Sequence, residues 1–74
     1  MNRDPKQFMA AVRGVPTWTV AVVLSRLTPG IDWRGCSKKR MAERWSVVAY
    51  ERLRAVTPEA LSAAVAQFKE ERKP

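Results

Sequence analysis

The sequence predicts an all-α protein, folded as a compact single domain of about four helices. Three observations favour this class. Apolar residues recur at helical spacing, cap and proline signals divide the chain into segments, and no pair of segments offers the alternation and tight turn of a β-hairpin. With 74 residues, the chain can build one small core. We therefore treat residues 1–74 as one domain, with helices expected over 5–13, 16–27, 38–56 and 58–72.

The first helix has clear start and stop signals. Asp4 can cap the helix and Pro5 suits its first position. Gly14 stands where a left-handed residue would end it. Phe8, Met9 and Val12 fall on one face, which we expect to be buried.

The second helix is the ambiguous element, because Trp18 and the valines that follow it also favour strands. A strand would need a partner strand, and no other segment supplies one. As a helix, this segment is apolar on nearly all sides and is expected at the centre of the bundle, with Trp18 in the core. Thr28, Pro29 and Gly30 end it.

The third helix has the clearest periodicity. Ser37 is a suitable N-cap, and apolar residues follow at helical spacing from Met41 through Trp45 to Val56. We expect one continuous helix here, with Trp45 in the core.

The fourth helix opens at Thr57 and Pro58, which repeat the cap and first-turn proline of the first helix. Leu61, Val65 and Phe68 supply its buried stripe. The charged residues 70–74 are expected to fray.

The composition excludes most catalytic chemistry. The chain has no His and one Cys, so it lacks the commonest general base and metal ligand and cannot form an internal disulfide. No arranged set of acids, no glycine-rich phosphate loop and no cluster of metal ligands is present. We expect no enzymatic activity, no cofactor, no metal and a reducing, cytoplasmic compartment. Without a signal peptide or a long apolar run, no membrane anchor is expected.

The net charge of +7 favours an anionic partner. Residues 34–44 contain five cations, several of them in the first turn of a helix, where cations oppose the helix dipole. A sequence selected for stability alone would carry acids there, so we predict a binding surface. Its cations are Arg34, Lys38, Lys39, Arg40 and Arg44.

Two further features extend this predicted surface. Trp33 lies in a short connection beside the cations and is the candidate anchor, with a core position as its alternative. A second cationic strip is formed by Arg3, Lys6 and Arg13. The competing interpretation of all these cations is an ordinary solvated basic face.

Nucleic acid is the alternative partner. The gap between the second and third helices is too long for the usual helix-turn-helix, and side chains that read bases are scarce. Phosphate attraction is easier to support than sequence reading. A repressor-like DNA-binding protein, an RNA-associated or ribosome-associated protein, and a structural virion component therefore stay open.

The whole chain resembles small phage-encoded regulators that bind RNA polymerase, being short, basic and helical and carrying the stretch Trp33–Arg40. The resemblance implies docking on acidic surfaces of the host polymerase, near its flap or clamp. It implies inhibition of promoter-specific initiation by interference with the sigma factor, and antitermination as a further activity. A monomer in the bacterial cytoplasm, with at most weak contact to nucleic acid, is the expected form.

Overall fold

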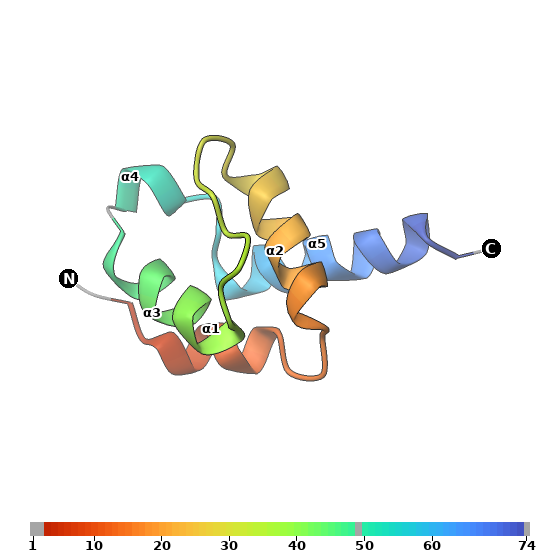
Figure 1. The fold of residues 1–74 in the computed structure, drawn as a ribbon, viewed down its shortest axis with the longest axis horizontal. Coiled ribbons are helices and arrows are strands. Elements are labelled where there is room, and N and C mark those ends of the chain that lie inside the picture. The colour runs from red at the N-terminus through yellow and green to blue at the C-terminus, as the bar shows by residue number, and fades with distance from the viewer. Residues whose placement is uncertain (1–2, 49, 74) are drawn as a thin grey trace.

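The computed structural model describes residues 3–48 and 50–73 and confirms the all-α class (Figure 1). Within these residues there is no β-strand. The helices in chain order are α1 (Pro5–Ala11), α2 (Thr17–Leu27), α3 (Lys38–Val47), α4 (Tyr50–Leu53) and α5 (Pro58–Glu71).

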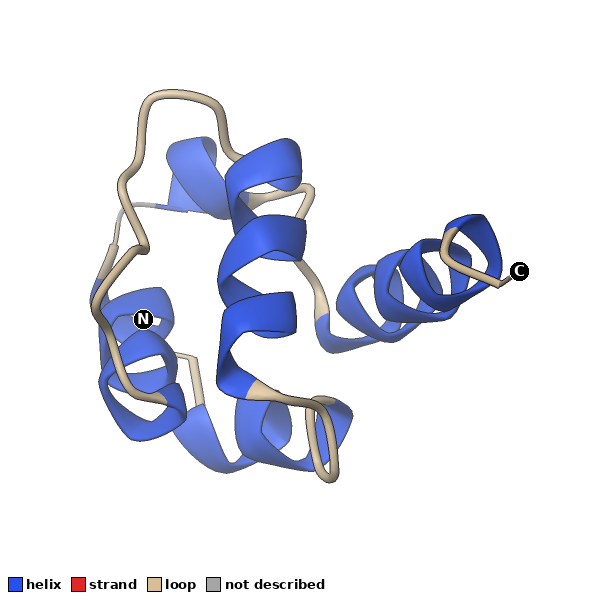
Figure 2. Ribbon diagram, turned by 45° about the vertical axis from the view of Figure 1, so that its right-hand side comes forward, coloured by secondary structure: helices blue, strands red, loops and turns tan. Residues whose placement is uncertain are grey.

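The helices pack around one core. Helix α1 lies against α3 and α5, and α2 lies against α5. The connection from residue 28 to residue 37 returns along α2 to the start of α3 (Figures 1 and 2). The end of α5 extends beyond the other helices (Figure 1), which lengthens the molecule to 42 × 23 × 23 Å.

Three of the predicted helix starts are capped as expected. Side-chain oxygens of Asp4, Ser37 and Thr57 each accept a hydrogen bond from a backbone N–H in the following turn, at 2.9, 3.1 and 3.0 Å. Gly14 has a φ of +76°, the left-handed conformation predicted for it. These local signals could be read directly from the sequence because each depends on neighbouring residues only.

The predicted continuous helix over 38–56 is wrong. Val48 has an extended backbone, with ψ of 143°, and separates α3 from α4. The core explains this break: the Trp45 indole N–H donates to the Val56 carbonyl at 2.7 Å. Eleven residues of unbroken helix would hold these residues roughly 16 Å apart. The break folds the chain back, so that Leu53 and Val56 are buried beside Trp45.

Trp45 is buried as predicted, but the predicted exposure of the other two tryptophans is reversed: Trp33 is buried and Trp18 is exposed. Trp33, expected as a partly exposed anchor, is 0% exposed. Its indole N–H donates to the Thr28 hydroxyl at 2.8 Å, and that hydroxyl donates to the Leu24 carbonyl at 2.6 Å. Trp33 is therefore a core residue that fixes the connection, and its assignment as a surface anchor is corrected.

Trp18, expected in the core, is 53% exposed. Helix α2 buries a different face, formed by Thr19, Val20, Val23 and Leu24. Because the segment is apolar on nearly all sides, its periodicity could not identify which face turns inward.

Helix α5 reaches the charged end of the chain. Helix α5 continues to Glu71, and the Arg72 guanidinium lies 5.1 Å from the Trp18 ring centroid and 5.5 Å from that of Phe68. Helix α5 thus falls within the predicted range 58–72; the fraying of residues 70–74 stays a prediction, and Pro74 lies outside the described residues. No helix in the described ranges is long and apolar enough to cross a membrane.

Candidate docking surface

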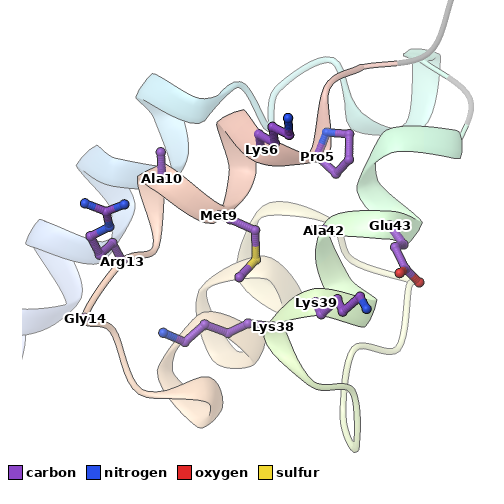
Figure 3. A pocket seen from close by; sticks show the side chains of 10 residues that line it. All are labelled: Pro5, Lys6, Met9, Ala10, Arg13, Gly14, Lys38, Lys39, Ala42 and Glu43. Atoms are coloured by element: carbon purple, nitrogen blue, oxygen red, sulfur yellow. The ribbon is translucent and has the colours of Figure 1, made fainter.

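A groove of about 560 Å³ runs between α1 and the first turns of α3 (Figure 3). It follows from the packing of α1 on α3, which places the end of one helix beside the beginning of the other. The groove combines basic side chains from both of the cationic segments that the sequence suggested. Those basic residues are Lys6, Arg13, Lys38 and Lys39.

Lys38 joins the two helices. Its ammonium group donates to the Val12 carbonyl at 3.2 Å. This carbonyl lies at the end of α1, where the helix dipole favours a cation. Lys38 therefore has a structural role as well as a charge, and Figure 3 shows it with Arg13 at the Gly14 end of the groove.

The side chains of Lys39 and Lys6 point in different directions. Lys39 is exposed and lies toward the other end, next to Glu43 (Figure 3). Lys6 lines the groove, but in this view its amino group points away from α3. The groove is thus cationic at both ends, with one carboxylate at the end that holds Lys39.

The floor of the groove is apolar. Met9 is 38% exposed and reaches from α1 toward the first turn of α3 (Figure 3). Ala10 and Ala42 line the groove beside it. An unbranched thioether adapts to differently shaped partner side chains, so Met9 suits a contact surface. The sequence placed Met9 on the apolar face of its helix, but helical periodicity alone did not show that it lies at the exposed edge of that face.

The other cations of the predicted cluster lie in a different hollow. Arg34, Arg40 and Arg44 line a space of about 900 Å³ together with Asp32 and Cys36. The five-cation surface expected from residues 34–44 is therefore divided between two hollows that share only Glu43, because α3 turns consecutive side chains to different sides.

Two arginines of this second hollow are held by the chain itself. The Arg34 guanidinium lies 3.2 Å from the Asp32 carboxylate, and Arg44 donates to the Asp32 carbonyl at 2.6 Å. Arg44 also lies 5.4 Å from the Trp33 ring centroid. The backbone N–H of Arg34, and then its side chain, donate to the Asp32 carboxylate and lower the pKa of that carboxyl. One arginine of this hollow is thus paired with an exposed carboxylate, and a second donates to a backbone carbonyl.

Arg3, assigned to the second cationic strip, is used inside the fold. Its guanidinium donates to the Val48 carbonyl at 2.7 Å, at the break between α3 and α4. The same group lies 5.0 Å from the Trp45 ring centroid. The structure therefore places Arg3 away from the α1–α3 groove that Lys6 and Arg13 line.

Comparisons of this chain with protein-family models, with curated proteins and with solved structures gave no match. Among the described residues, no three His, Cys, Asp or Glu side chains form a group that could hold a metal ion.

Proposed function

We propose that this chain is a small transcription regulator that docks on an acidic surface of bacterial RNA polymerase through its α1–α3 groove. The observation that carries the proposal is the convergence of cations from two separate segments around one exposed apolar side chain. Arg13 follows α1, Lys38 and Lys39 open α3, and Met9 lies between them.

The lining of the groove favours a protein partner over nucleic acid. A phosphate backbone would gain little from the exposed apolar side chain of Met9. An acidic protein segment with an apolar side chain would use both the cations and the methionine. The groove therefore fits a carboxylate-rich protein surface best.

The mechanism follows from these contacts. Attraction between the chain, with its net charge of +7, and an acidic surface raises the association rate, and the apolar contact slows dissociation. Regulation then results from occupying a polymerase surface needed by the sigma factor. The resemblance to small phage regulators supports RNA polymerase as the partner, inhibition of initiation as the main effect, and the host cytoplasm as its location. Antitermination is the further activity that this resemblance suggests.

The test measures binding of the purified chain to immobilised RNA polymerase, with and without the sigma factor. The groove variant carries Arg13→Glu and Lys39→Glu. These changes have opposite effects on the two helix dipoles, so the fold should be little affected. The matched control, Arg54→Glu with Lys69→Glu, makes the same change in net charge at exposed positions outside the groove.

We expect the groove variant to bind at least about tenfold more weakly, because like charges brought together at an interface are strongly unfavourable. The control variant should lose only the part of the binding affinity that comes from the net charge of the chain. Equal losses in the two variants would contradict the groove as the docking site. Failure of the original chain to bind the polymerase would contradict the partner.

Binding of the chain to mixed-sequence DNA duplexes tests the alternative, a nucleic-acid function. If about five phosphates were contacted, the logarithm of affinity would fall with the logarithm of salt concentration at a slope of roughly −4 to −5. A slope of this size, together with loss of duplex binding in the groove variant, would replace the proposal with a nucleic-acid function.

A further inference from the structure

A further groove, here called the α2 groove, lies on α2. It shares no lining residue with the α1–α3 groove. Its volume is about 500 Å³. One face of α2 forms its wall, with residues at helical spacing: Trp18, Ala21, Val22 and Ser25. Arg26 and residues 34–35 line it as well.

The wall of this groove exposes large apolar side chains. Trp18 is 53% exposed and Val22 is 36% exposed. The Trp18 ring packs against the core residue Phe68 in an edge contact, with a centroid distance of 5.8 Å. Arg72 also stacks on it. A large aromatic side chain that is fixed and half exposed is typical of an interface anchor.

The apolar wall lies among arginines. Arg26 and Arg34 line the groove, and Arg72 stacks on the Trp18 ring. Arg26 pairs with Glu71 at 2.9 Å and Arg34 pairs with Asp32 at 3.2 Å. Both pairs are exposed to solvent, so exchanging their carboxylates for those of a partner costs little.

From these contacts we propose that the α2 groove binds a short acidic segment of a partner protein. One aliphatic or aromatic side chain of the segment seats against Trp18 and Val22, and carboxylates on either side of it meet Arg26, Arg34 and Arg72. The segment is held at a site distinct from the α1–α3 groove, so this inference stands whether or not the polymerase proposal holds.

A second copy of this chain is a poor occupant. A stable interface buries about 800 Å² on each partner, whereas the exposed half of one tryptophan offers roughly 100 Å². Each copy also carries a net charge of +7, which opposes self-association at a surface rich in arginine. The size and the charge of the groove therefore both favour a short acidic segment.

The test uses a synthetic peptide in which leucines one helical turn apart lie between glutamates. One control peptide has lysine in place of glutamate, and another has serine in place of leucine. The indole N–H signals in ¹⁵N NMR spectra give a direct readout. Trp33 and Trp45 are buried and donate to Thr28 and Val56, whereas Trp18 is exposed.

We expect the acidic peptide to shift the Trp18 indole signal and to protect this residue from acrylamide quenching, while the Trp33 and Trp45 signals stay in place. Neither control peptide should do so. The Val22→Asp variant should bind the peptide about tenfold more weakly. Since Val22 is already partly exposed, this change should leave the fold intact, as unchanged Trp33 and Trp45 signals would verify.

The variant Lys39→Glu, in the α1–α3 groove, should bind the peptide as the original chain does, which separates this inference from the proposed function. Equal binding of the lysine peptide, or full binding by Val22→Asp, would overturn it. So would a Trp18 shift that appears only on adding anionic phospholipid vesicles, or one that follows concentration-dependent dimerisation.

Discussion

The Trp33 indole holds the connection between α2 and α3 through one buried hydrogen bond. Its acceptor, the Thr28 hydroxyl, is itself fixed by the Leu24 carbonyl. The indole N–H has the hydroxyl as its partner within a site closed to solvent, since Thr28 is 4% exposed and Trp33 0%. A buried donor that loses its acceptor keeps its full desolvation penalty.

Thr28→Val should therefore lower the free energy of unfolding by about 1–3 kcal/mol, although the two side chains have similar shapes. Thr28→Ser retains the hydroxyl and should be the milder change. Chemical denaturation of the two variants, with hydrogen exchange at the Trp33 indole, checks this prediction. A valine variant as stable as the original chain would show that the hydrogen bond is not what fixes Trp33.

The fold alters the ionisation of Asp32. Because Arg34 donates from its backbone and its side chain, the pKa of Asp32 lies below its usual range. Any stability gained from this carboxylate is therefore complete above its unfolded-state pKa. It is lost as the pH falls through the lower, folded-state pKa.

Removing the guanidinium in Arg34→Ala should raise the pKa of Asp32 only part of the way, since the backbone N–H remains 3.0 Å from the carboxylate. NMR titration of the Asp32 carboxyl carbon measures both values. A variant with an unchanged pKa would assign the whole effect to the backbone and remove the role of the side chain.

At the scale of elements, the Val48 carbonyl at the break after α3 needs a hydrogen-bond partner from outside the helix. Arg3 supplies that partner and also covers the Trp45 ring. Arg3→Ala should lower the free energy of unfolding by about 1–3 kcal/mol, because a charged hydrogen bond and a cation–π contact are lost together.

Arg13→Ala is the control for this prediction, since Arg13 is exposed. It should change stability by no more than about 0.5 kcal/mol. Thermal unfolding of both variants provides the comparison. Equal effects would contradict the structural role given to Arg3.

The same element shows how far sequence reasoning reaches. Helix starts were predictable because caps such as Ser37 act on the next few residues. The end of α3 was not predictable, because it depends on a hydrogen bond between Trp45 and Val56. Hydrophobic periodicity does not encode this contact. Likewise, the sequence identifies the basic residues, and helical spacing separates Lys39 from Arg40, but the groove that Lys39 lines exists only because α1 packs against α3.

At the scale of the whole molecule, two surfaces of different chemistry lie on one small core. The α1–α3 groove is rich in cations around a methionine, and the α2 groove is apolar with arginines at its edges. A net charge of +7 accelerates encounter with acidic partners at either surface, and this acceleration should weaken as salt is added. Which groove is occupied then depends on local contacts.

The central claim, that the α1–α3 groove is the docking surface, is tested most directly by two neighbouring substitutions. Lys39→Glu and Arg40→Glu make the same change in charge within the first turn of α3, where an added carboxylate is favourable. Lys39 lines the α1–α3 groove, whereas Arg40 lines the second hollow.

The measurement is the affinity of each variant for immobilised RNA polymerase at one salt concentration, with circular dichroism to verify that both remain helical. The account predicts that Lys39→Glu weakens binding by about tenfold or more and that Arg40→Glu retains most of it. Equal affinities, or a larger loss in Arg40→Glu, would contradict it.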